Sequence, residues 1–471
     1  MDYFPHQLEY VTQHYNKEYH GLWWAMGAGK TRAILDGAAR LYAEGEIDTL
    51  VVIALKGVHT NWIRRQAPIW LKDVAWRGIV WNDKRRTKAW KEELEAVLST
   101  DDALRIIAIN IEAFSRKNSD AAELVRTIRH RSNASVLGVI DESSTIKDPK
   151  ANKSKEVVKL SDQFKYRRVL TGTPITESPF NLFQQGEFLK RKYWGTSYYM
   201  FRQRYGQFRT ARFGNRSFDE LVSYRNLDDL KMRMQDLGTE VEKQLSIPKA
   251  YKVVDVELTA EQRRLYNEML QTFAVQIDDD LITVENALSK LQKLQQIATG
   301  HIIHEDQSVT TLEHNGISTF KGLTDTINDK IIVFCKFMQP IKELMEALGD
   351  EAVEYSGRID DEAREQAVDR FQSDPSCKFI VISTKSNAVF GLDLYAAGVV
   401  IYYNNDYSLE RRMQSEDRAH RPGNKHDRVV YYDFVRTDTV DEDIQEAFAN
   451  KIDVASQVTR LMRLWLRPRS P

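Results

Sequence analysis

The chain has 471 residues, of which 42% are hydrophobic and 29% are charged, with a formal net charge of −1 at pH 7. This composition excludes a disordered or fibrous protein and indicates a globular chain of about two or three domains. A net charge near zero gives no global case for a polyanionic partner, so any basic surface must be local.

The sequence also disfavours membrane-spanning and secreted proteins. No apolar run reaches the length of a membrane span, and residues 1–5 lack the charged-then-apolar build of a signal peptide. The two cysteines, Cys335 and Cys377, lie in apolar runs without a metal-ligand spacing, so we expect buried reduced thiols. These features predict a cytoplasmic protein without a membrane partner.

The first motif in the chain predicts a phosphate-binding loop. An apolar run comes before it and an amphipathic helical pattern after it, and its residues are Met26, Gly27, Ala28, Gly29, Lys30 and Thr31. Such a turn directs backbone N–H groups and the positive end of a helix at one place. Lys30 would contact the β- and γ-phosphates of a nucleotide, and the Thr31 hydroxyl would bind Mg²⁺. Trp24 stands where the usual pattern has its first glycine, so the motif alone is a partial match.

Strand-like apolar runs alternate with helical patterns up to Pro174. The runs are 22–25, 50–55, 106–109, 136–140 and 169–170. This alternation predicts a parallel sheet that holds ligands at the carboxyl ends of its strands. Asp141 and Glu142 follow one such strand, where Asp141 would hold Mg²⁺ and Glu142 would deprotonate the attacking water. An acidic pair is as often a helix cap, but the phosphate loop on the same sheet favours the catalytic interpretation.

Residues 176–248 interrupt the alternation, and we expect a mostly helical insertion there. Within it, the segment Lys190–Arg216 carries eight Lys and Arg residues and no Asp or Glu, interleaved with aromatic residues. Basic groups neutralise phosphates, while aromatic rings stack on bases or pack helices together. We favour packing for most of the aromatic residues and phosphate contact for some of the arginines, with Arg202 and Arg204 as candidates.

The alternation returns after residue 248. The strand-like runs are 252–258, 330–335, 352–356, 378–383, 399–404 and 429–435. A pattern that occurs twice predicts two α/β domains joined by the insertion. The final residues, 452–471, are basic and apolar, and a helix docked on the body is favoured over a dedicated nucleic-acid contact.

Two arginines near the end of the chain are candidates for transition-state stabilisation. Arg418 and Arg421 are three residues apart, so on a helix they would share a face. Guanidinium groups directed at the γ-phosphate from the second domain would make hydrolysis depend on domain closure. The next residues, Asn424–Asp427, match the guanine-selecting pattern of GTPases, but a whole domain separates them from the phosphate loop. We interpret them as a polar turn.

Taken in order, these motifs resemble the Swi/Snf-like family of superfamily two helicases and ATPases. The segments similar to its motifs are Phe4–Gln7, Met26–Thr31, Asn61–Trp62, Asp141–Ser144, Leu170–Pro174, Ser383–Lys385, Gly391–Leu394 and Gln414–Gly423. The resemblance implies RecA-like domains with parallel sheets at 1–175 and 249–451, on either side of the helical insertion 176–248 and followed by the tail 452–471.

The resemblance also implies roles for individual residues. ATP and Mg²⁺ would bind between the domains, with Gln7 reading the adenine and Gly391 contacting the nucleotide. The catalytic residues would be Lys30, Asp141, Glu142, Arg418 and Arg421. The DNA contacts implied by motif position would be made by Lys56, Asn61, Trp62, Thr173, Ser383, Thr384 and Lys385.

The sequence departs from the family pattern at two places. Trp24–Ala25 replaces the acidic pair that normally precedes the phosphate loop, and Ser144 replaces the histidine of the acidic box. The second change leaves open how hydrolysis is coupled to the Leu170–Pro174 motif. The chain leaves little room for accessory domains, so it resembles the minimal members found in phages and prokaryotes.

The function expected from these motifs is an ATP-driven motor that translocates on double-stranded DNA. A strand-separating helicase of replication, recombination or repair is the alternative, followed by an ATP-gated DNA clamp without turnover. A metabolite kinase would need only the phosphate loop and would leave the paired arginines and the basic segment unexplained. Single-stranded DNA and RNA stay open as partners.

Overall fold

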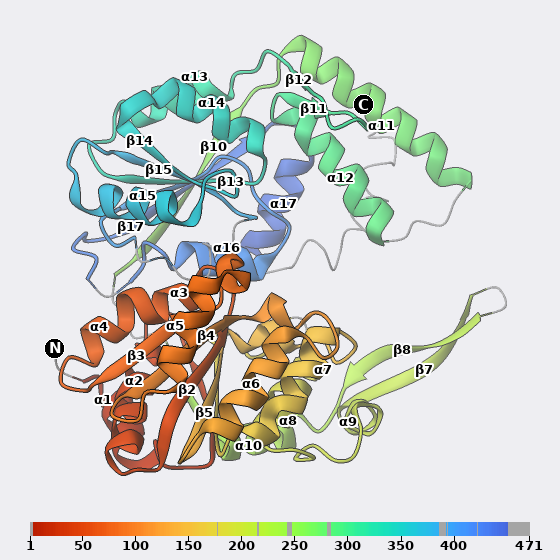
Figure 1. Cartoon of the computed structure of the whole chain (residues 1–471). Coiled ribbons are helices and arrows are strands. Elements are labelled where there is room, and N and C mark those ends of the chain that lie inside the picture. Colours follow the sequence, from red (N-terminus) through yellow and green to blue (C-terminus); the bar gives the residue numbers. More distant parts are fainter. Residues whose placement is uncertain are drawn as a thin grey trace. The chain divides into compact units, whose positions relative to one another are not determined.

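The computed structural model of the chain describes residues 3–176, 178–213, 216–242, 247–279, 284–385, 392, 394–421 and 423–450. It divides into two compact units, residues 1–244 and 245–471, and each is built around its own parallel sheet (Figure 1). The predicted contact of Gly391 with the nucleotide and the predicted tail helix in 452–471 fall outside the described residues. None of the helices in the described ranges combines the length and the apolar character that a membrane crossing requires.

The sheet of the first unit has seven parallel strands in the order β3-β4-β2-β5-β6-β1-β9. The strands are β1 (Tyr19–Trp24), β2 (Ile47–Ala54), β3 (Trp76–Val80), β4 (Leu104–Asn110), β5 (Ser135–Asp141), β6 (Tyr166–Leu170) and β9 (Gly238–Val241). The five predicted strands are confirmed, while β3 and β9 were not predicted. The central strands form because runs of apolar, largely β-branched residues are buried on both faces of a parallel sheet.

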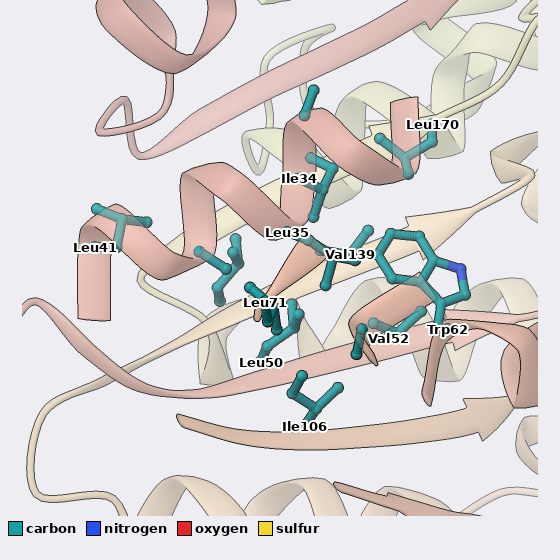
Figure 2. Close-up of a cluster of buried hydrophobic side chains, with 14 of the residues drawn as sticks. Ile34, Leu35, Leu41, Leu50, Val52, Trp62, Leu71, Ile106, Val139 and Leu170 are labelled. Carbon is teal, nitrogen blue, oxygen red and sulfur yellow. The ribbon is translucent and has the colours of Figure 1, made fainter. Parts of the chain in front are cut away.

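Helices connect these strands. They are α1 (Pro5–Glu9), α2 (Lys30–Ala43), α3 (Val58–Asn61), α4 (Ala67–Trp70), α5 (Lys88–Leu98), α6 (Asp120–Arg131), α7 (Asn152–Lys159), α8 (Leu182–Leu189), α9 (Tyr198–Tyr205) and α10 (Leu227–Leu237). Figure 2 shows how α2 places Ile34 and Leu35 against Leu50 and Val139 of the sheet. Each such buried side chain contributes about 1.5–3 kcal/mol, and this packing fixes the start of α2 relative to the strand ends.

The expectation of a mostly helical insertion is wrong for its central part. The strands β7 (Gly206–Phe213) and β8 (Arg216–Tyr224) pair antiparallel as a hairpin, which extends away from the seven-stranded sheet (Figure 1). Gly214–Asn215 between two strand-like runs is a hairpin signal in the sequence. After α10 the chain returns to the first sheet as β9, so the first unit extends beyond the predicted boundary at residue 175.

The aromatic residues of the insertion mainly pack against one another, as favoured from the sequence. Trp194, Phe201 and Tyr205 are buried, and the Phe201 ring lies 5.2 Å from the ring of Trp194 and 4.8 Å from that of Tyr205. Edge-on contacts of this kind add to the burial of the rings. This aromatic cluster joins α9 to the rest of the first unit.

The second unit contains a six-stranded parallel sheet in the order β10-β17-β16-β13-β15-β14. Its strands are β10 (Lys249–Val256), β13 (Ile331–Cys335), β14 (Ala352–Tyr355), β15 (Phe379–Ser383), β16 (Val399–Tyr402) and β17 (Val429–Arg436). All six were predicted. A short antiparallel ribbon consists of β11 (His301–Ile303) and β12 (Val309–Thr311).

The helices of the second unit are α11 (Ala260–Asp279), α12 (Val284–Ala298), α13 (Gly316–Thr324), α14 (Met338–Leu348), α15 (Asp361–Ser373), α16 (Leu409–Glu416) and α17 (Val440–Ala449). Cys335 and Cys377 are both buried free thiols, as expected from the sequence. The two α/β units confirm the predicted fold class.

Candidate active site

The predicted phosphate loop connects β1 to α2. Its two glycines, Gly27 and Gly29, have φ values of 78° and 76°, in the left-handed region that favours glycine. A Cβ on Gly29 would also lie only 2.1 Å from Nε2 of Gln7, so a side chain there would meet both strain and a clash. The loop leads directly into the N-terminus of the 14-residue helix α2, where N–H groups and the helix dipole favour an anion.

Trp24, in place of the first glycine of the usual pattern, belongs to the strand rather than to the loop. Its side chain is 1% exposed, and its indole N–H donates to the Thr239 hydroxyl at 2.9 Å. This contact ties β1 to β9 at the point where the loop begins. The departure at this position is therefore a core substitution that leaves the turn of Gly27 and Gly29 intact.

The N-terminal glutamine motif contacts the phosphate loop. The buried Gln7 carboxamide donates to the carbonyl of Gly29 at 3.0 Å and accepts from the backbone N–H of Phe4 at 2.9 Å. The neighbouring His6 ring nitrogen Nε2 bonds to the carbonyl of Ala28 at 2.8 Å. Residues 6 and 7 therefore help to set the shape of the loop.

Lys30 lies within electrostatic reach of the acidic box. Its ammonium group donates to the carbonyls of Trp24 and Ala25, at 2.7 and 3.3 Å, at the start of the loop. Burial raises the pKa of Asp141 above its usual value, and the charge of Lys30 is among the influences that oppose this shift. The structure thus brings together two of the residues that the sequence singled out.

The Asp141 carboxylate is supported by two donors. Its Oδ2 accepts from the Trp62 indole N–H at 2.8 Å, and its Oδ1 accepts from the backbone N–H of Glu142 at 3.0 Å. Mg²⁺ prefers oxygen ligands and retains several waters. Asp141 and the Thr31 hydroxyl are oxygen donors of the type that would hold Mg²⁺.

The prediction that Trp62 contacts DNA is wrong. Its side chain is 1% exposed and lies at one end of the hydrophobic cluster in Figure 2, where its N–H is directed at Asp141. A buried indole presents no surface to DNA. Its role in this structure is to orient a carboxylate 79 residues away in sequence.

Replacing Trp62 with phenylalanine should therefore impair the site rather than DNA binding. Because the variant loses the indole donor to Asp141, we expect ATP hydrolysis to fall about 10-fold or more and to need more Mg²⁺ for half-maximal rate. Titration of the hydrolysis rate with Mg²⁺ measures both effects. Trp90→Phe is the matched control, because it replaces a similarly buried indole whose N–H donates instead to the carbonyl of Val80. An unchanged Mg²⁺ requirement in Trp62→Phe would contradict the assigned role.

Glu142 is held by two hydroxyl groups. Its Oε1 accepts from the Ser144 hydroxyl at 2.9 Å and from the Thr171 hydroxyl at 2.5 Å. Its φ of 54° is in the left-handed region, a strained conformation for a residue with a side chain. Thr171 reaches Glu142 because β5 and β6 are neighbouring parallel strands in which Asp141 is paired with Leu170. Ser144, which replaces the family's histidine, therefore bonds directly to the expected catalytic base.

The two arginines of the second unit follow a helix instead of sharing one of its faces, which corrects that expectation. Helix α16 ends at Glu416, and both Arg418 and Arg421 lie in the following turn. The Arg418 guanidinium donates to the carbonyls of Gln414 and Leu392 at 2.9 and 3.1 Å. Nε of Arg421 donates to the Asp417 carbonyl at 3.0 Å, and burial lowers the pKa of Arg421 to about 10.

The polar turn at Asn424 has a structural role, as interpreted from the sequence. Its buried carboxamide donates to the carbonyls of Ala397 and Ala419, at 2.9 and 2.8 Å. Its oxygen accepts from the backbone N–H of His426 at 2.9 Å. These bonds hold the turn that follows Arg421.

The remaining DNA-binding candidates differ in exposure. Lys56 and Lys385 are exposed, and Asn61 and Thr173 are partly buried. Ser383 and Thr384 are only 3% and 4% exposed, so their side chains present little surface to DNA, contrary to expectation. The two candidates in the insertion have partners within the first unit. The Arg202 guanidinium lies 4.4 Å from the centre of the Phe208 ring, and Arg204 pairs with Asp229 at 3.0 Å.

Sequence comparisons match both units to known domains. The family described as "SNF2-related domain" matches residues 5–308, and the "Helicase conserved C-terminal domain" matches residues 317–423. One relative is the ATP-dependent helicase fft3 of Schizosaccharomyces pombe, 34% identical over 137 residues, which are 28% of this chain and 15% of fft3. Another is the DNA annealing helicase and endonuclease ZRANB3 of Bos taurus, 25% identical over 70% of this chain and 30% of that protein.

Among solved structures, the SWI2/SNF2 ATPase core of Sulfolobus solfataricus in complex with double-stranded DNA aligns over 98% of this chain and 95% of that one, with 21% identity and a TM-score of 0.42. The chain spans 15%, 30% and 41% of the first three curated relatives that it matches. Because the SNF2-related domain alone matches well over half of the residues, the chain belongs to the SNF2-related family.

Proposed function

We propose that the chain is a DNA-dependent ATPase that translocates on double-stranded DNA. The observation that carries this proposal is the grouping of Lys30, Asp141 and Glu142 at the carboxyl ends of the parallel strands of the first unit. This edge is where α/β sheets bind ligands. Membership of the SNF2-related family supports the choice of ATP over other phosphate-containing ligands.

In the proposed reaction, the backbone N–H groups of residues 27–31 and the Lys30 ammonium bind the phosphates. Mg²⁺, held by Thr31 and Asp141, would neutralise charge on the phosphate oxygens. Glu142 orients the attacking water and accepts its proton. The hydroxyl groups of Ser144 and Thr171 donate to its carboxylate and keep it in place. Arg418 and Arg421 are proposed to stabilise the transition state from the second unit.

DNA is proposed as the partner on two grounds. One relative is named as a DNA annealing helicase, and exposed basic residues such as Lys56 occupy positions where the family motifs imply DNA contacts. Lysine and arginine bind phosphates without reading sequence, so we expect binding that weakens strongly with salt. Translocation would follow if each ATP cycle alternately tightened the DNA contacts of the two units.

ATP hydrolysis measured without nucleic acid, with single-stranded DNA, with duplex DNA and with duplex RNA tests the proposal. We expect duplex DNA to stimulate hydrolysis most strongly. Equal rates in all four mixtures would overturn DNA dependence, and stimulation by duplex RNA alone would change the substrate class. DNA binding without stimulated phosphate release would instead indicate an ATP-gated clamp.

A strand-separating helicase is the second candidate, because the hairpin of β7 and β8 projects from the first unit (Figure 1). Its base is anchored, since the Phe208 ring stacks 6.1 Å from that of Phe180 and the Tyr224 hydroxyl donates to Ser178 at 3.2 Å. Strand separation needs a projecting element of this kind. A fluorescent forked duplex and a triplex-displacement assay distinguish the two activities: an unwound duplex favours the helicase, whereas triplex loss alone favours the translocase.

A further inference from the structure

We infer that Gln185 is a positioning residue that couples the DNA-facing loop after β6 to the catalytic carboxylate of Glu142. This inference rests on the proposed function. Gln185 lies in α8, all eight residues of which are buried, and its own side chain is fully buried. A glutamine in this setting costs free energy unless both ends of its carboxamide are bonded.

Both ends of the carboxamide are bonded, and to two different loops. Oε1 accepts from the Ser143 hydroxyl at 2.8 Å, next to Glu142 in the acidic box. Nε2 donates to the carbonyl of Pro174 at 2.8 Å, within the loop that follows β6, and to that of Asn181, just before α8, at 3.1 Å. The Gln185 side chain is therefore a bridge between the acidic box and this loop.

The start of the same loop bonds directly to Glu142, through Thr171. The backbone N–H of Thr173 donates to the Thr171 hydroxyl at 3.1 Å, and that hydroxyl donates to Oε1 of Glu142 at 2.5 Å. Thr173 is the residue at which the family motif implies a DNA contact. A shift of Thr173 on DNA binding would therefore act on Glu142 through Thr171, and on Ser143 through Pro174 and Gln185.

This bridge accounts for coupling in a chain that lacks the family's histidine. The Ser144 hydroxyl that stands in its place donates to Glu142 within the acidic box. Thr171 links the start of that loop to the acidic box, and Gln185 links Pro174, three residues later, to the same box. Because the loop is held at these two points, its movement would displace Glu142.

The test compares the full-length chain with Gln185→Leu, which keeps the approximate volume and removes both polar contacts. We expect the ratio of the hydrolysis rate with duplex DNA to the rate without it to fall about 3- to 30-fold. The KM for ATP and the Kd for DNA should stay within about twofold of wild type, because the fully buried Gln185 presents no surface to either ligand. A purely structural role would instead lower thermal stability and leave the ratio unchanged.

Gln184→Leu is the matched control, since Gln184 is the adjacent buried glutamine of α8 and its side chain makes no hydrogen bond to the described residues. It should keep the wild-type ratio, and a similar loss in Gln184→Leu would overturn the inference. Ser143→Ala removes one contact of the bridge with little change in volume, and it carries the test if Gln185→Leu does not fold. We expect Ser143→Ala to lower the ratio too, and the double variant to be no worse than Gln185→Leu.

The outcomes separate the inference from the proposed function. If wild-type hydrolysis is not stimulated by duplex DNA, the proposed function fails and no variant is needed to show it. If the wild type is stimulated and Gln185→Leu or Ser143→Ala keeps the full ratio, the proposed function stands and the bridge is wrong.

Discussion

Glu142→Gln is expected to lower kcat for ATP hydrolysis by about 10²- to 10⁴-fold, which is the usual contribution of a general base. Glutamine keeps the size of the side chain and still offers an oxygen to the hydroxyls of Ser144 and Thr171. It cannot accept a proton from the attacking water. The loss should therefore appear in the chemical step, while ATP still binds.

Single-turnover hydrolysis and equilibrium binding of ATP measure the two quantities separately. Glu93→Gln is the control, because Glu93 is an exposed residue of α5. This variant should hydrolyse ATP at the wild-type rate. Hydrolysis at the wild-type rate in Glu142→Gln would show that the base has been wrongly assigned. Loss of ATP binding would show that Glu142 supports the fold of the site instead of the chemistry.

Lys30→Ala is expected to impair ATP binding, the step that precedes hydrolysis. The variant loses the cation that would bind the β- and γ-phosphates, so both the affinity for ATP and the rate should fall, with kcat lowered by about 10²- to 10³-fold. The same ammonium group donates to the carbonyls of Trp24 and Ala25 at 2.7 and 3.3 Å. The phosphate loop of the variant therefore also loses two internal hydrogen bonds. ATP binding and hydrolysis, measured alongside thermal unfolding, test this expectation.

Lys91→Ala provides the comparison, since Lys91 is an exposed cation on α5 of the same unit. It should bind and hydrolyse ATP like the wild type. The informative result is the contrast between the two site variants: Lys30→Ala should lose ATP binding, whereas Glu142→Gln should retain it. Retained binding in Lys30→Ala would mean that phosphate is held elsewhere.

The strands at the centre of each sheet could be predicted from the sequence alone. Strand β2 consists almost entirely of buried apolar residues, and that composition is visible in the sequence without knowledge of its neighbours. Strand β3 was missed because Arg77 and Gly78 interrupt it and only Ile79 is buried. Strand β9 has four residues and is recognisable only by its pairing with β1.

In the candidate site, too, local patterns could be predicted from the sequence, whereas contacts between distant residues could not. The loop at Lys30 and the acidic pair after β5 are local patterns, and both could be placed from residue type and spacing. The roles of Trp62 and Gln185 depend on contacts with residues 79 and 42 positions away, so local spacing carried no sign of them. Polar residues among the apolar ones of α8 were the available signal for Gln185, because burial of such groups demands partners.

The pairing of β1 with β9 sets the order in which the protein can form during its synthesis. The backbone N–H of Ala25, the first residue after β1, donates to the carbonyl of Val241 at 2.7 Å, and Trp24 bonds to Thr239, 215 residues away in sequence. At about 5–20 residues per second, ribosomes make these two partners about 10 to 40 s apart. A nascent chain whose phosphate loop has left the ribosome therefore lacks the strand that pairs with β1 until translation of the first unit is nearly finished.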